Sequence, residues 1–186
     1  MVLNSVNPRN RRLLSDLKKI EEEFKYHQFI NIFYTNDVYP PEKYTVVYSG
    51  IKSIALSPKS TADNKIFLEI FEHKVDIELH INYPRYKPMS IIKTDIFHPN
   101  FRSAYPHEIC IGDYWAPGED LADIIYKIGE MIQYKTYNVK SPLNGIAAKW
   151  ARENINLFPL DNTELRKAHR TYNDTEEGKQ IEINLF

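Results

Sequence analysis

The sequence is poor in cysteine and in long apolar runs, and both features narrow the class of protein. Cys110 is the only cysteine among 186 residues, so the chain can form no internal disulfide and needs no oxidising compartment to fold. No apolar run approaches the roughly 20 residues of a membrane span. The N-terminus also lacks the apolar segment of a signal peptide. We therefore expect a cytoplasmic protein with no membrane partner.

The chain has no excess of either charge and no evident metal motif. Its net charge of -1 gives no reason to expect a nucleic-acid partner. Its 6 histidines and single cysteine show no metal-ligand spacing, so we expect neither a metal nor a cofactor. Length and composition are typical of a globular protein, with one domain over residues 1–160. Residues 161–186 are expected to form a C-terminal extension, partly helical or frayed.

A helix is expected between Arg11 and His27. Apolar residues recur there at helical spacing, with lysine and glutamate between them: Leu13, Leu14, Leu17, Ile20 and Phe24. The outer face starts basic and then turns acidic, against the preference of the helix dipole. Its basic residues are Arg11, Arg12, Lys18 and Lys19. A solvated face is the ordinary interpretation, and a surface kept for a partner is the alternative.

Four strand-like segments follow this helix. They share a bias towards β-branched and aromatic residues: "FINIFYT" (29–35), "KYTVVYSGI" (43–51), "KVDIELHIN" (74–82) and "MSIIKTDIF" (89–97). Short turn-like segments join them, which favours an antiparallel meander with one buried face.

Helical periodicity returns after the cysteine region. Residues 121–132 present one strongly apolar face, with Asp120 as the expected N-cap, and predict a central buried helix. A third helix is expected to start with Ser141 as its cap and Pro142 in its first position, and to end before Pro159. Strands and helices are thus segregated. The predicted fold class is α+β: an N-terminal helix, a four-stranded antiparallel meander, an irregular cysteine loop, then central and C-terminal helices.

Cys110 lies in a loop between Asn100 and Trp115. A lone cysteine is most often inert and buried. This loop, however, is irregular and contains proline and glycine, which indicates a position near the surface. The Asn100 amide can donate hydrogen bonds to an oxyanion without titrating. A cysteine hydrolase would need His98 or His107 as its base, and a histidine so near in the sequence is weak evidence for one.

Five short motifs occur in one order along the chain: "YPRYKP" (83–88), "FHPN" (97–100), "IC" (109–110), "WAP" (115–117) and "SPLN" (141–144). Each motif alone is weak. As an ordered set, in step with the predicted helix, meander, loop and helix, they resemble the ubiquitin-conjugating enzyme family from Arg11 to Phe158. The resemblance implies a transferase that carries a ubiquitin-like protein on a cysteine.

The same resemblance assigns roles to individual residues. Cys110 would hold the C-terminus of a ubiquitin-like protein as a thioester and pass it to an amine of a protein substrate. Asn100 would support the oxyanion or the loop geometry, and His98 would be structural. Ser141 would lie beside the incoming lysine. The first helix, residues 11–27, would meet the activating enzyme.

The chain also departs from the family pattern. The loop between Asn100 and Cys110 is longer than usual, and the gap from Cys110 to Trp115 is shorter. These departures suggest a divergent member of the kind found in bacterial operons beside an activating enzyme and a ubiquitin-like protein, with antiviral defence as the expected setting. The alternative is a non-catalytic variant of the same fold or an RWD-like binding module. Such relatives typically lack the cysteine.

Overall fold

The computed structural model describes residues 7–34, 38–112 and 114–167. Its helices and strands, in chain order, are α1 (Pro8–Phe24), β1 (Ile30–Tyr34), β2 (Lys43–Leu56), β3 (Phe67–Glu78), β4 (Met89–Ile92), α2 (Leu121–Ile132) and α3 (Gly145–Glu153). Two short 3₁₀ helices follow, at Ile155–Leu157 and Leu165–Lys167. This order confirms the predicted α+β class.

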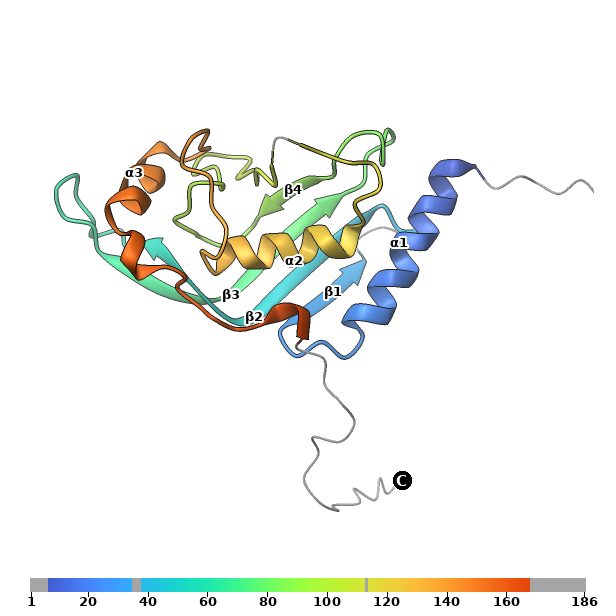
Figure 1. The fold of residues 1–186 in the computed structure, drawn as a ribbon, viewed down its shortest axis with the longest axis horizontal. Coiled ribbons are helices and arrows are strands. Elements are labelled where there is room, and N and C mark those ends of the chain that lie inside the picture. Colours follow the sequence, from blue (N-terminus) through green and yellow to red (C-terminus); the bar gives the residue numbers. More distant parts are fainter. Residues whose placement is uncertain (1–6, 35–37, 113, 168–186) are drawn as a thin grey trace, which may run out of the picture.

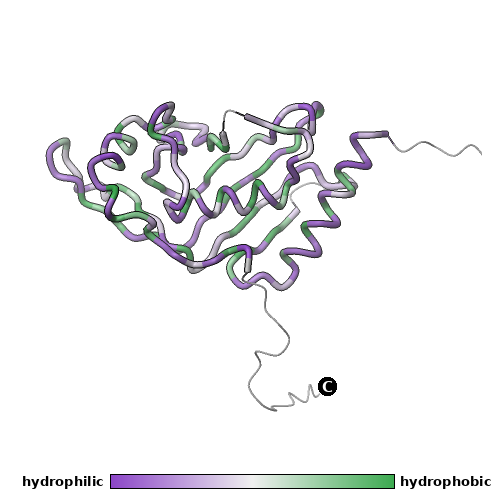
Figure 2. Tube along the Cα trace, viewed as in Figure 1, coloured by the Kyte–Doolittle hydropathy of each residue, from purple (hydrophilic) through white to green (hydrophobic). Residues whose placement is uncertain are grey.

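The four strands form one antiparallel sheet in the order β1-β2-β3-β4. Helix α2 lies across one face of this sheet, α1 lies beside β1, and α3 lies at the opposite end (Figure 1). Hydrophobic residues concentrate in the strands and in bands along α2 (Figure 2). The main core therefore lies between α2 and the sheet, as the apolar face of residues 121–132 predicts.

Two strands are longer than their sequence patterns indicate. Strand β2 continues past the expected end at Ile51, because the pairing with β3 shifts between Ser49 and Ser53. Gly50 lies at this irregularity with a φ of 75°, a conformation that side chains rarely adopt. The extended part of β2 pairs with Phe67 and the residues after it, so β3 begins seven residues before the predicted Lys74.

Helix α1 is anchored by a buried carboxylate. Asp16 is only 2% exposed. It accepts hydrogen bonds from Arg12 at 2.8 Å, from the Tyr83 hydroxyl at 2.6 Å and from the backbone N–H of Leu121 at 3.3 Å. This network joins α1 to the segment before β4 and to the start of α2. It keeps the buried charge both paired and hydrogen-bonded.

The start of α3 corrects the sequence prediction. The helix begins at Gly145, and its N-cap is Asn144, whose side chain accepts from the backbone N–H of Ala147 at 3.1 Å. Ser141 is not the cap. Its backbone N–H instead donates to the Asn138 side chain at 3.1 Å, in a turn before the helix. By contrast, the expected N-cap of α2 is confirmed, since Asp120 accepts from Asp123 N.

The first residues after the predicted domain boundary pack on the domain. The carbonyl of Leu165, a buried residue, lies 2.8 Å from Nε2 of His27. The Asp161 carboxylate accepts from the backbone N–H of Lys52 at 2.8 Å. The described part of the predicted extension, up to residue 167, is therefore docked. The rest of the predicted extension, 168–186, lies outside the described residues.

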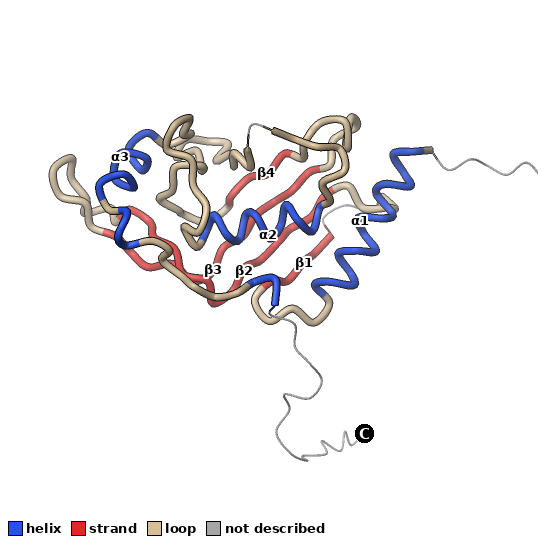
Figure 3. The backbone as a smooth tube through the Cα atoms, in the orientation of Figure 1, coloured by secondary structure: helices blue, strands red, loops and turns tan. Residues whose placement is uncertain are grey.

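A long connection, residues 93–120, joins β4 to α2 and contains Cys110 (Figure 3). The predicted strand 89–97 ends at Ile92, and the remainder of that segment belongs to this connection. None of the helices that the structure describes is long and apolar enough to cross a membrane.

Candidate active site

The residues between Asn100 and Cys110 form a small β-hairpin. Phe101 and Ile109 are paired across it in an antiparallel bridge. Its tip is exposed, with Tyr105 89% exposed. The hairpin therefore projects outward and leaves its two ends side by side. The backbone N–H of Cys110 donates to the Asn100 carbonyl at 2.8 Å.

The Asn100 side chain connects two further segments. Its Nδ2 donates to the Cys110 carbonyl at 2.9 Å, and its Oδ1 accepts from the backbone N–H of Asn138 at 2.7 Å. The residue is 4% exposed. Of the two roles that the resemblance implies for this amide, the loop geometry is the one that these contacts favour. Asn138 is a site residue that the sequence did not indicate, because its backbone makes the contact.

The segment that carries Ser141 is fixed to the same motif. The backbone N–H groups of Leu143 and Asn144 donate to the Pro99 carbonyl at 2.9 and 3.1 Å. Ser141 itself is exposed. Leu143, rather than Ser141, reaches the wall of the pocket at Cys110. The structure thus places Ser141 on a surface segment held beside Pro99 and Asn100.

Cys110 is a free, partly exposed thiol. It lines a small pocket of about 150 Å³. The other described lining residues are Lys87, Pro88, Met89, Ser90, Glu108, Ile109 and Leu143. The thiol is therefore open to a reagent, unlike the inert buried cysteine that is the usual alternative.

His98 is completely buried and faces the protein interior. Its Nδ1 accepts from the backbone N–H of Asn100 at 3.1 Å, and its ring packs edge-on against Phe101 and Tyr134. Burial lowers the pKa of His98 to about 3, so the ring is neutral near pH 7. These features support a structural role, which positions the backbone of the "HPN" motif.

The histidine contacts argue against a cysteine hydrolase. His107 is exposed, and its Nδ1 lies 3.3 Å from the Arg102 carbonyl within the hairpin. It lines a separate cavity, together with Arg102 and Asn144. Among the described residues, no histidine lines the pocket of Cys110. Neither His98 nor His107 is thus placed as a base for the thiol.

The "YPRYKP" and "WAP" motifs pack against each other. The indole N–H of Trp115 donates to the Pro84 carbonyl at 2.7 Å, and the Trp115 and Tyr83 rings lie 6.1 Å apart. Tyr83 is also part of the Asp16 network. These contacts fix the chain before β4 against the chain after Cys110.

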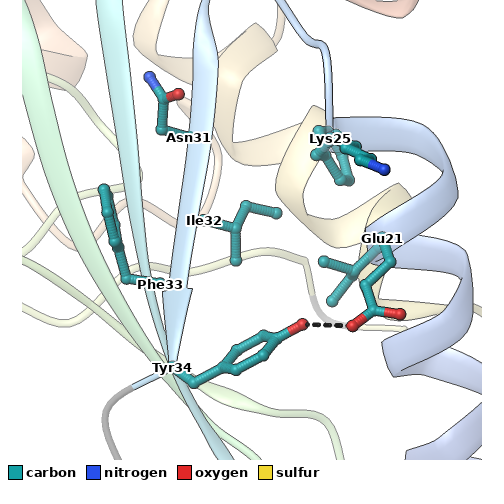
Figure 4. Close-up of a pocket in the computed structure, with 8 residues that line it drawn as sticks. Glu21, Lys25, Asn31, Ile32, Phe33 and Tyr34 are labelled. Atoms are coloured by element: carbon teal, nitrogen blue, oxygen red, sulfur yellow. Dashed lines mark hydrogen bonds between the residues drawn. The ribbon is translucent and has the colours of Figure 1, made fainter. Parts of the chain in front are cut away.

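Of the larger cavities outside the cysteine pocket, two lie near α1 or α2. One, of about 440 Å³, extends from Asn100 and Gly112 to residues 119–131 around α2. The other, of about 470 Å³, lies between α1 and β1, where Tyr34 donates to Glu21 at 3.1 Å (Figure 4). Only the first contains a predicted site residue, and it borders the chain that follows Cys110.

The arrangement brings together a partly exposed thiol, a loop braced by the buried Asn100, and a neighbouring groove along α2. A family model described as ubiquitin-conjugating enzyme matches residues 62–164. The chain belongs to this family. No curated protein matches it in sequence.

Solved structures show the same fold. One is a protein from Plasmodium yoelii described as a ubiquitin conjugating enzyme. It superposes with a TM-score of 0.56 at 22% identity, covering 83% of this chain and 90% of that one. The likeness at this identity establishes the common architecture.

Proposed function

We propose that the chain is a conjugating enzyme for a ubiquitin-like protein, with Cys110 as the carrier. The observation that carries this proposal is the partly exposed Cys110, held beside the buried Asn100 by two hydrogen bonds. The sulfur takes the acyl group of the ubiquitin-like C-terminus from the cysteine of an activating enzyme. One thioester is thereby exchanged for another of similar energy, and the thiol of the activating enzyme leaves.

The second step transfers the acyl group to a protein substrate. An unprotonated lysine amine attacks the thioester carbonyl, the C–S bond breaks, and Cys110 leaves as a thiolate. An amide forms, and the amine loses a proton. No strongly activating base is needed at the cysteine, because a thiol with a greatly lowered pKa is a poorer nucleophile in exchange. The absence of a histidine among the described residues of the pocket fits this chemistry.

The groove beside Asn100 suits an extended peptide. It begins at Gly112, two residues after the carrier, and runs along α2. Its walls carry Glu119, Asp123 and Glu130, partly neutralised by Lys127 and Arg166. We assign this groove to the C-terminus of the ubiquitin-like protein. The acceptor lysine approaches from the side of Ser141, which is exposed on its braced segment.

The alternative is a non-catalytic binding module on the same fold. Nothing in the fold itself distinguishes the two classes. The accessibility of Cys110 favours the enzyme, because a binding module has no need of a thiol at this place. The activating enzyme is assigned to α1, within the predicted surface of residues 11–27.

Charging on a non-reducing gel tests the proposal. The chain is incubated with ATP, a cognate activating enzyme and its ubiquitin-like protein. We expect an adduct that thiol reagents remove, which is lost in Cys110→Ala. In Cys110→Ser the adduct should persist as a thiol-resistant oxyester. If an activating enzyme that is itself charged yields no adduct, the chain is a binding module.

A further inference from the structure

Strand β4 and the chain that carries the cysteine run antiparallel, with one consistent register. Ile91 is paired with Glu108. Ile92 N donates to the His107 carbonyl at 3.0 Å, and Ile109 N donates to the Ser90 carbonyl at 2.9 Å. In this register Ser90 lies opposite Ile109. If the register continues beyond that pair, Met89 lies opposite Cys110, and Lys87 lies opposite Gly112.

The burial pattern supports this extension of the register. Side chains on one strand alternate between faces, and residues opposite each other share a face. Pro88, Ser90, Ile109 and Ile111 are buried, whereas Lys87 and Met89 are exposed and Cys110 is partly exposed. Lys87 and Cys110 therefore stand on the same outer face as diagonal neighbours. Such pairs are about 7–8 Å apart at their α-carbons, within reach of a long side chain.

A hydrogen bond holds the Lys87 ammonium at the cysteine loop. Its Nζ donates to the Gly112 carbonyl at 2.9 Å. Lys87 also lines the pocket of about 150 Å³ that contains Cys110, and it is the only lysine among the described residues that do so. None of the described carboxylates forms an ion pair with it, so the amine is not sequestered by a counter-charge.

The backbone of Lys87 is itself fixed. Its carbonyl lies 3.2 Å from Nε2 of His80. Three residues earlier, the Pro84 carbonyl accepts from the Trp115 indole. The next residue, Pro88, is buried. The Lys87 backbone is therefore fixed and its side chain lines the pocket of Cys110, which raises the effective concentration of the amine at any acyl group bound there.

We propose that Lys87 is an internal acceptor for the acyl group carried by Cys110, which makes it a self-modification site. This inference rests on the proposed carrier function. The unprotonated Lys87 Nζ attacks the thioester carbonyl, a C–N bond forms, the C–S bond breaks, and the sulfur leaves as a thiolate. The amine gives up one proton to water. A charged chain without an external acceptor thus ends as a Lys87 isopeptide with a free Cys110.

A chemical acyl donor tests this step without the native partners. The full chain is incubated with a fluorescent peptide ending in Gly-Gly as its 2-mercaptoethanesulfonate thioester. We expect a thiol-sensitive adduct on Cys110 that converts to a thiol-resistant one, faster at higher pH because only the neutral amine attacks. Tandem mass spectrometry of the wild-type chain should place the resistant adduct on Lys87.

Matched variants separate the two proposals. Lys87→Arg retains a donor for the Gly112 carbonyl and should keep the thiol-sensitive adduct. It should form the resistant adduct at no more than roughly a tenth of the wild-type rate. Lys140→Arg, at an exposed lysine beside Ser141, should behave as wild type. A Cys110 adduct that stays thiol-sensitive, or a resistant adduct unchanged in Lys87→Arg, would overturn the role of Lys87 alone. No Cys110 adduct from either this donor or a charged activating enzyme would overturn both proposals.

Discussion

The Asn100 side chain joins its own segment to the segments that carry Cys110 and Asn138. Its donor holds the Cys110 carbonyl and its acceptor holds the Asn138 backbone N–H, both in a nearly buried position. Removing it leaves two backbone groups without partners, which is costlier than losing two exposed hydrogen bonds. The residue is thus expected to affect both stability and the placement of the thioester.

Asn100→Ala should lower the free energy of unfolding by roughly 2–4 kcal/mol. Charging of Cys110 should continue, while discharge to free lysine slows about tenfold, because the thioester is less well positioned. Urea unfolding and single-turnover discharge measure the two effects.

The matched variant is Asn100→Asp, which keeps the acceptor for Asn138 but loses the donor to Cys110. It should be less destabilised than Asn100→Ala and equally slow in discharge. Wild-type discharge in both variants would mean that the tie to the Cys110 carbonyl has no part in transfer.

At the scale of the element, some basic residues of α1 stabilise the fold and others are exposed to solvent. Arg12 binds Asp16 at 2.8 Å and the Tyr83 hydroxyl at 3.0 Å, and Lys19 is paired with Asp120. These two side chains serve the fold. Arg11 and Lys18 are exposed, so they are the members of the basic face that are available for the proposed contact with an activating enzyme. The proposed partner surface of this helix therefore includes Arg11 and Lys18, and not Arg12 or Lys19.

Neighbouring substitutions on α1 should separate these two groups. Arg12→Ala leaves the buried Asp16 without its ion pair and should cost about 3 kcal/mol of stability. The double variant Arg11→Ala with Lys18→Ala should change stability by less than about 0.5 kcal/mol. It should slow charging by the activating enzyme, most clearly at low salt. Unchanged charging kinetics in the double variant would place the activating enzyme elsewhere.

Elements with strong local patterns could be predicted from the sequence. Helix α2 and its Asp120 cap follow from a periodic apolar face and a local hydrogen bond. The start of α3 could not, although Ser141 and Pro142 form a typical helix start. Tertiary contacts compete there: Asn138 binds the Ser141 N–H and Pro99 binds the Leu143 N–H, so the helix starts later.

The site was predictable to a similar extent. Asn100 and Cys110 lie close in the sequence and in ordered motifs, so their pairing could be anticipated. Asn138 contributes through its backbone, which carries no sequence signal. Lys87 lines the cysteine pocket because of the antiparallel register between two segments, and a register is set by long-range pairing. Their separate roles in transfer stay predictions.

At the scale of the whole molecule, two buried histidines couple stability to pH. Burial lowers the pKa of His73 to about 4, despite its hydrogen bond with the Ile51 carbonyl, and lowers that of His98 to about 3. In the unfolded chain both rings titrate near 6.5. Between these values the unfolded state binds protons that the folded state does not. The contribution of these two rings to the free energy of unfolding is therefore fully present above about pH 6.5 and falls as the pH drops towards 4.

The contribution of His73 can be isolated by substitution. Each such ring should contribute a slope of about 1.4 kcal/mol per pH unit within this window. His73→Gln retains a donor for the Ile51 carbonyl but does not titrate. Its unfolding free energy should therefore depend less on pH between 6 and 4.5, by about that slope. Urea unfolding of His73→Gln and of the wild-type chain at closely spaced pH values measures this difference. Equal slopes in the two would show that folding does not lower the pKa of His73.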